Sequence, residues 1–214
     1  MNLHRTAPRI ALGTLLALTL TACGGSDHDG HEAPAALSTA RNGDVFNAAD
    51  VAFATAMIPH HAQAVQMANL AADRPLPAAL RTLVDDVHRT QVAEVETMVT
   101  WLTDWGEEIP ETSMDHANAG HDMSDMDGSD GSHEGAAMPG MMDDAQMAEL
   151  EKASDAAFPQ LWMTMMVEHH EGAITMARAE QEDGHFPAAV DLAEDIVSAQ
   201  EKEIATLREL LSAS

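Results

Sequence analysis

The chain has 214 residues, with 36 acidic and only 10 basic side chains, and its formal net charge is −26 at pH 7. Such a charge excludes nucleic acid as a partner, because the phosphates would be repelled, and it raises the local concentration of cations. The single cysteine excludes an internal disulfide.

Residues 1–22 are typical of a bacterial lipoprotein signal peptide. Arg5 and Arg9 give a positive start, a short apolar run follows, and Leu20-Thr21-Ala22 directly precedes Cys23. The apolar run is too short to span a membrane. The sequence therefore predicts an exported protein, processed before Cys23 and held at the extracytoplasmic face of the cell membrane by a lipid on that residue.

The next stretch, residues 23–43, is rich in Gly, Ser, Asp, Pro and Ala and is predicted to be a flexible tether. The first helix is expected from Asn47, a good N-cap residue, to about Ala72. Pro59 lies inside this helix, where it removes a backbone hydrogen bond, and we expect a kink there.

Pro77 suits the first position of a second helix, whose apolar spacing continues to Trp105 before Gly106 ends it. Residues 107–142 then lack large aliphatic side chains and are predicted to be a flexible crossover. His and Met are frequent in this crossover, which makes the tract a candidate for weak capture of soft metal ions. The weaker ligand candidates are Met114, His116, His121, Met123, Met126, His133, Met138, Met141 and Met142.

The second half resembles the first in its helical spacing. Asp143 to about Ala153 is predicted to form a short helix, and Ser154 or Asp155 is expected to cap a longer one that stops near Asp183-Gly184. Pro187 opens the last helix. No stretch is predicted to form a strand.

The two halves share one motif at a constant offset. Met57-Ile58-Pro59-His60-His61 with Ala64 and Met67-Ala68 recurs 109 residues later as Met166-Val167-Glu168-His169-His170 with Ala173 and Met176-Ala177. A fixed offset is typical of a duplicated unit. We therefore expect an all-α fold, a four-helix bundle made of two repeated helical hairpins over residues 44–212, because a bundle buries four apolar stripes in one core.

On a helix, each motif places two imidazoles and two thioethers on one face. Imidazole with thioether and without thiolate suits Cu(I), and by the same softness Ag(I), better than Zn(II), Mg(II) or Ca(II). The alternative is that the methionines only fill the core. Two adjacent histidines on an apolar face, present twice, favour ligands, since each ring needs a partner if it is buried. The main ligand candidates are Met57, His60, His61, Met67, Met166, His169, His170 and Met176.

These motifs, together with Met138-Pro139-Gly140-Met141 and with Gln91-x-x-Glu94 and its counterpart Gln200-x-x-Glu203, resemble the exported domain-of-unknown-function family 305. The resemblance covers about residues 44–212. It implies a ferritin-like helical fold and a link to CopM-type periplasmic proteins that bind copper and silver.

The sequence thus favours a non-enzymatic, lipid-anchored protein that binds copper as Cu(I), or silver, for sequestration, resistance or transfer to an unknown partner protein at the cell envelope. Two alternatives remain open. One is a structural or chaperone-like helical lipoprotein without metal. The other is a ferritin-like di-metal enzyme, for which Asp85-x-x-His88 and Glu182-x-x-His185 are the nearest approaches to the required carboxylate–histidine motifs.

Overall fold

The structure of the chain, a computed structural model, describes residues 36–112 and 138–213. The predicted signal peptide, Cys23 and most of the crossover lie outside the described residues. The secondary-structure elements, in chain order, are β1 (Ser38–Thr39), β2 (Val45–Phe46), α1 (Ala48–Ala71), α2 (Ala78–Trp105), α4 (Asp144–Lys152), α5 (Phe158–Asp183) and α6 (Pro187–Ala213). None of these helices is long and apolar enough to cross a membrane.

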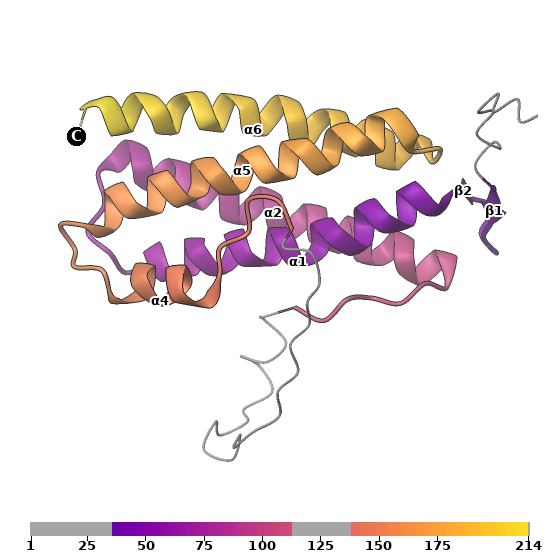
Figure 1. The fold of residues 1–214 in the computed structure, drawn as a ribbon, viewed down its shortest axis with the longest axis horizontal. Coiled ribbons are helices and arrows are strands. Elements are labelled where there is room, and N and C mark those ends of the chain that lie inside the picture. Colours follow the sequence, from indigo (N-terminus) through magenta and orange to yellow (C-terminus); the bar gives the residue numbers. More distant parts are fainter. Residues whose placement is uncertain (1–35, 113–137, 214) are drawn as a thin grey trace, which may run out of the picture. The chain divides into compact units, whose positions relative to one another are not determined.

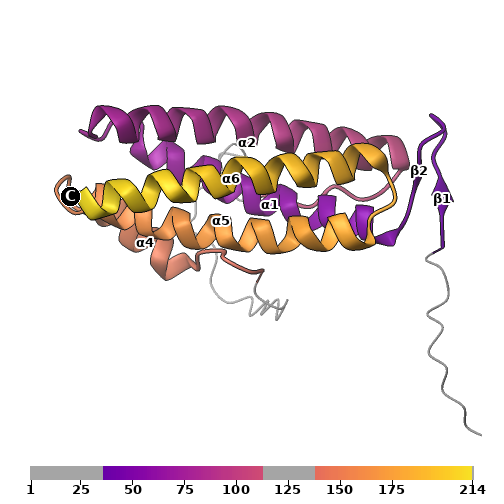
Figure 2. The ribbon, with the colours of Figure 1, turned by 90° about the horizontal axis from the view of Figure 1, so that it is seen from above.

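Four long helices lie side by side as two hairpins, α1 with α2 and α5 with α6 (Figure 1). The hairpins meet along α1 and α5, and the short α4 packs against both of these helices. Figure 2 shows the same helices from above. α1 buries residues on every side because it contacts α2, α5 and α4. The prediction of an all-α fold built from helical hairpins is confirmed.

The helix ends follow the expected local signals with one exception. Asn47 caps α1 through a reciprocal capping box with Asp50, and α1 continues through Pro59 to Ala71. Gly106 ends α2 in the left-handed conformation, with φ of 78°. The exception is α5, because Ser154 caps a preceding turn through Ala157 and the helix itself begins only at Phe158.

The prediction that no strand forms was wrong. Ser38 pairs with Phe46 and Thr39 with Val45 in a short antiparallel ladder, so ordered structure begins inside the stretch predicted to be a tether. The ring of Phe46 stacks on Trp105 with centroids 4.4 Å apart, which fastens this hairpin to the end of α2. The alternating pattern of a two-residue strand is too short to be seen in a sequence.

A buried pair of carboxyl groups joins the start of α1 to the turn between α5 and α6. Asp50 accepts hydrogen bonds from the backbone N–H groups of Asn47, His185 and Phe186. Glu180, only 2% exposed, lies within hydrogen-bonding reach of Asp50. Burial, and next the hydrogen bond and the charge of Asp50, raise the pKa of Glu180 from 4.5 to about 9. Glu180 is therefore protonated at neutral pH.

Glu180→Gln is expected to stabilise the protein in mildly alkaline solution. The wild-type proton is held in the folded state up to about pH 9 but is lost above 4.5 in the unfolded state, so stability falls as the pH rises through this window. Glutamine has no such proton to lose, and we expect a gain on the order of 2 kcal/mol at pH 8 that shrinks at pH 5. Urea unfolding at the two pH values measures it, with the exposed Glu182→Gln as control. Equal pH profiles for wild type and Glu180→Gln would contradict the assignment.

Candidate metal centre

The four histidines of the repeated motif form one layer across the middle of the bundle, and all four are 0% exposed. One apolar cluster, which contains Met67, Trp162 and Met166, lies on one side of this imidazole layer. A second cluster, which contains Met57 and Met98, lies on the other side. The histidines therefore form a polar level between two apolar clusters, and the structure brings both copies of the motif together as expected.

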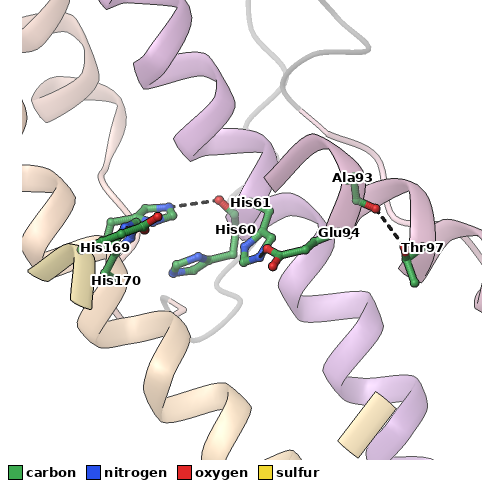
Figure 3. Close-up of polar contacts among 8 residues, drawn as sticks. His60, His61, Ala93, Glu94, Thr97, His169 and His170 are labelled. Carbon is green, nitrogen blue, oxygen red and sulfur yellow. Dashed lines mark hydrogen bonds and ion pairs between the residues drawn. The ribbon is translucent and has the colours of Figure 1, made fainter. Parts of the chain in front are cut away.

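The rings follow one another from α1 to α5 (Figure 3). His60 and His169 are in direct contact, with ring centroids 3.8 Å apart, and each is 6.3 Å from its neighbour in sequence, His61 or His170. This row connects the two hairpins through the interface between α1 and α5. The outermost rings, His61 and His170, each reach a carboxylate on the outer helix of their own hairpin.

Every Nε2 atom of the layer contacts an oxygen that can only accept a hydrogen bond. His61 Nε2 is 2.8 Å from Glu94 Oε2 (Figure 3). His170 Nε2 is 2.7 Å from Glu203 Oε2. His60 Nε2 is 3.1 Å from the carbonyl oxygen of Pro139. His169 Nε2 is 3.0 Å from the carbonyl oxygen of His60. In the neutral rings the proton therefore resides on Nε2, because only that tautomer satisfies these four oxygens.

The opposite ring nitrogen, Nδ1, carries no proton in this tautomer. With the proton on Nε2, each Nδ1 carries a lone pair that needs a donor or a metal ion. All four Nδ1 atoms are buried and have no hydrogen-bond partner among the described residues. Unpaired buried nitrogens cost free energy, so a hydrogen-bond donor or a bound ion at this level would stabilise the interior. Nδ1 is the atom that such a ligand would meet.

The inner two rings are held in the form that binds metal. Burial, with a smaller contribution from His61, lowers the pKa of His60 from 6.5 to about 3. Burial and the neighbouring rings lower the pKa of His169 well below 6.5. Both imidazoles are therefore neutral at physiological pH, and a neutral imidazole is the ligating form.

The buried thioethers lie in the apolar clusters above and below the imidazole layer. Met57, Met67 and Met166 are 0% exposed. Met57 belongs to one cluster, and Met67 and Met166 belong to the other. Met176 is only half-buried and lines a separate cavity of about 270 Å³ beside Glu180. Met57, Met67 and Met166 thus belong to the two apolar clusters that flank the layer, and Met176 is partly buried against the cluster that contains Met57.

Within residues 36–112 and 138–213, no group of three or more His, Cys, Asp or Glu side chains is close enough to hold a metal ion. This geometry disfavours ions that need four nitrogen or oxygen ligands, such as Zn(II). Soft monovalent ions accept low coordination numbers and thioether ligands. Imidazole nitrogen and thioether sulfur are ligands that Cu(I) and Ag(I) prefer, and both kinds of side chain are buried in this interior.

The carboxylate motifs of a di-metal enzyme do not reach this layer. Asp85, Glu182 and His185 are exposed, and His88 is half-buried on α2. The carboxylates that do contact the histidines, Glu94 and Glu203, each bind an Nε2 atom from outside the layer.

The end of the crossover is an ordered part of the site, contrary to its description as a flexible linker. We call residues 138–142 the strap. Its Pro139 carbonyl binds His60, and the backbone N–H and C=O of Met142 form two hydrogen bonds, of 2.7 and 2.8 Å, with the side-chain amide of Gln63. A Cβ atom at Gly172 would overlap the Pro139 carbonyl, so only glycine lets the strap lie this close to α5.

The strap carries three of the weaker ligand candidates, Met138, Met141 and Met142. The remaining six, Met114, His116, His121, Met123, Met126 and His133, lie outside the described residues. The roles of Gln63 and Gly172 were missed in the sequence, although they occupy the same position of the two repeats, 109 residues apart, and differ there. That difference between otherwise similar motifs was the available signal, because the two copies contact the single crossover in different ways.

Two further buried side chains were noted only as part of the family resemblance. Within the part of the chain that the structure describes, Gln91, 2% exposed, leaves both amide atoms without a partner, and Gln200, 3% exposed, leaves its Oε1 atom unpaired. They lie one helical turn before Glu94 and Glu203, which bind the histidines. The interior therefore holds more unsatisfied polar atoms than the imidazoles alone.

Comparison with solved structures shows the same fold in other proteins. A DUF305 protein from Streptomyces coelicolor is 29% identical, with a TM-score of 0.63 over 77% of this chain and 93% of that chain. A DUF305 fragment from Deinococcus radiodurans is 25% identical, with a TM-score of 0.63 over 83% of this chain and 100% of the other. CopM in its Cu(II)-bound form is 26% identical, with a TM-score of 0.60 over 77% of this chain and 96% of that chain.

Among curated proteins the comparison finds no match. The model of one family, described as domain of unknown function DUF305, matches residues 50–211, a range that contains both histidine motifs, the strap and all four long helices except their outer ends. The chain therefore belongs to the DUF305 family.

Proposed function

We propose that this protein binds soft monovalent metal ions, Cu(I) and Ag(I), through the imidazole layer, and that it sequesters them or passes them on without catalysing a reaction. The observation that carries the proposal is the set of four buried Nδ1 lone pairs without a partner among the described residues. The apolar clusters on either side of the layer contain Met57, Met67 and Met166. Imidazole nitrogen and thioether sulfur are the ligands that such ions prefer.

The relatives support a metal-binding role. CopM, which shares 26% of its residues with this chain, is described in a Cu(II)-bound form. Its Cu(I)-bound and Ag-bound forms align at 22% identity and support the fold alone. Copper is therefore the first ion to test on this chain, and silver is a chemically similar probe that does not change oxidation state under ordinary conditions.

We further propose that the bundle arose by duplication and has ferritin-like topology. The support is that equivalent contacts recur in both halves, since His61 binds Glu94 and His170 binds Glu203 with the same separation of 33 residues.

We also propose that the crossover, including its residues outside the described part, collects ions and delivers them to the imidazole layer.

The place of action is proposed to be the extracytoplasmic face of the membrane. The Streptomyces coelicolor relative is provisionally described as secreted. The Leu20-Thr21-Ala22-Cys23 sequence supports export and a lipid on Cys23. The net charge of −26 fits a protein that concentrates cations outside the cytoplasm.

The central test replaces the inner histidines. His60→Leu with His169→Leu should abolish tight Cu(I) and Ag(I) binding while leaving helicity unchanged, because leucine fills a similar volume without a lone pair. The metal-free variant should unfold at a higher temperature than the wild type, since it no longer buries the unpaired Nδ1 atoms. At a free-ion concentration of about 100 times Kd, the free energy of unfolding of the wild type should rise by about 2.7 kcal/mol, and that of the variant should not change.

Competition titration with a Cu(I) chelator and thermal unfolding with and without Ag(I) measure these effects. The matched control is His88→Ala with His185→Ala, which removes the same number of imidazoles outside the layer. If the leucine variant stays helical and binds as tightly as this control, the histidines are core residues and the proposal fails.

The second test concerns the carboxylates behind the outer rings. Glu94→Ala should weaken metal binding by about 10- to 100-fold, because His61 loses the acceptor that fixes its proton on Nε2. Glu94→Gln, whose amide oxygen still accepts a hydrogen bond, should lose less of its affinity for the metal ion. The control is Glu96→Ala on the exposed face of the same helix. Equal affinities for the two alanine variants would show that Glu94 does not orient a ligand.

The third test concerns the anchor. Cys23→Ala should leave the precursor unprocessed or release the protein from the membrane fraction, because the lipid is attached to that thiol. Fractionation of cells followed by immunoblotting measures the distribution. A variant that fractionates and migrates as the wild type does would contradict the proposed lipidation.

A further inference from the structure

A second cavity lies beside the imidazole layer, between α1, the strap and α4, with a volume of about 460 Å³. Three methionines line it, Met141 and Met142 from the strap and Met147 from α4. Pro59 and Gln63 of α1 form its wall on the side of the motif, and Asp144 and Glu151 lie at its outer edge. We call this the thioether cavity.

Two of these methionines, Met141 and Met147, differ from those that only fill the core, whereas Met142 is 4% exposed and belongs to an apolar cluster. Met98 and Met166 are 0% exposed and are packed within the apolar clusters, which is ordinary for a flexible apolar side chain. Met141 and Met147 are half-buried and border open space instead. Met147 also packs against the apolar cluster that contains Met67. Both thioethers line the cavity, where a polarisable sulfur is available as a ligand.

The backbone that carries the three methionines is held from both sides. Gln63 fixes Met142 through two hydrogen bonds. Asp143 and Gln146 form a reciprocal capping box, which fixes the first turn of α4 and with it Met147. Only the side chains are left to adapt, and this combination of a rigid frame and flexible thioethers suits an ion that must be bound and then released.

The thioether cavity is also coupled to the imidazole layer. The strap reaches His60 through the Pro139 carbonyl and Gln63 through Met142, and His60 and Gln63 lie one turn apart on α1. The four imidazoles are 0% exposed, so an ion cannot reach them directly from solvent. The cavity, in contrast, is bordered by the exposed carboxylates of Asp144 and Glu151, which attract cations without being soft ligands themselves.

We propose that the thioether cavity is a second soft-metal site, in which Met141, Met142 and Met147 bind Cu(I) or Ag(I) before the ion passes to the imidazole layer. The transfer step rests on the proposed function, whereas binding in the cavity does not. No bond other than metal–ligand contacts forms or breaks, and the ion keeps its oxidation state. Hard cations such as Ca²⁺ are excluded from this role because thioethers bind them poorly.

The experiment uses the full chain labelled with ¹³C at the methionine methyl groups and titrated with Ag(I). The methyl resonances of Met141, Met142 and Met147, assigned by single leucine variants, should shift during the titration. Met141→Leu with Met147→Leu should bind one equivalent of Ag(I) fewer than the wild type. Transfer of Ag(I) from a chelator to its imidazole layer should also be slower. Met98→Leu with Met163→Leu, which removes the same number of thioethers elsewhere, should behave as the wild type.

The outcomes separate the cavity from the imidazole layer. In His60→Leu with His169→Leu, the three methyl resonances should still shift, since the cavity has its own ligands. Unshifted resonances in a wild type whose imidazole layer fills would overturn the cavity site and leave the proposed function intact. Shifted resonances together with unchanged binding in the histidine variant would support the cavity and overturn the imidazole layer. If the imidazole layer of Met141→Leu with Met147→Leu takes up Ag(I) at the wild-type rate, the proposed transfer step is wrong.

Discussion

The contact between His60 and His169 is the point on which the arrangement of this bundle depends. It lies where α1 and α5 meet, and these two helices provide the main contact between the hairpins. His169 also binds the backbone carbonyl of His60, so the second hairpin is placed on the first by a polar contact at the buried level. A bundle held only by apolar side chains would tolerate sliding between hairpins, whereas a buried directional contact specifies one register.

The apolar clusters on either side of the layer set the chemical state of the buried histidines. They exclude water, which keeps the pKa of His60 and His169 low and the rings neutral. The carboxylates of Glu94 and Glu203 hold the outer rings in a defined orientation from the rim of the bundle. The same environment that makes unpaired imidazole nitrogens costly therefore also keeps the lone pairs of His60 and His169 unprotonated, as is common where stability and function compete.

Most of the fold was predictable because its signals are local. Asn47, Pro77, Gly106 and Pro187 mark helix ends through capping and through restricted backbone angles, and these ends agree with the structure. The start of α5 was misplaced because Ser154 caps a turn that the helix does not continue. The repeated histidines could be recognised as one candidate site from their offset. The sequence could not show which ring nitrogen of each histidine is left without a partner. That depends on oxygens from Pro139, Glu94 and Glu203, which are distant in sequence.

The strap is held almost entirely by main-chain atoms: the carbonyl of Pro139, the N–H and C=O of Met142, and the close approach to Gly172. The side chains of Met138 and Met141 are therefore not needed to keep it in place. Substitutions at these two positions can change the chemical softness of the surface beside the histidines while the bundle remains intact. Over evolutionary time, this separation of scaffold and ligand would let related proteins acquire different metal preferences by changing a few residues of one short segment.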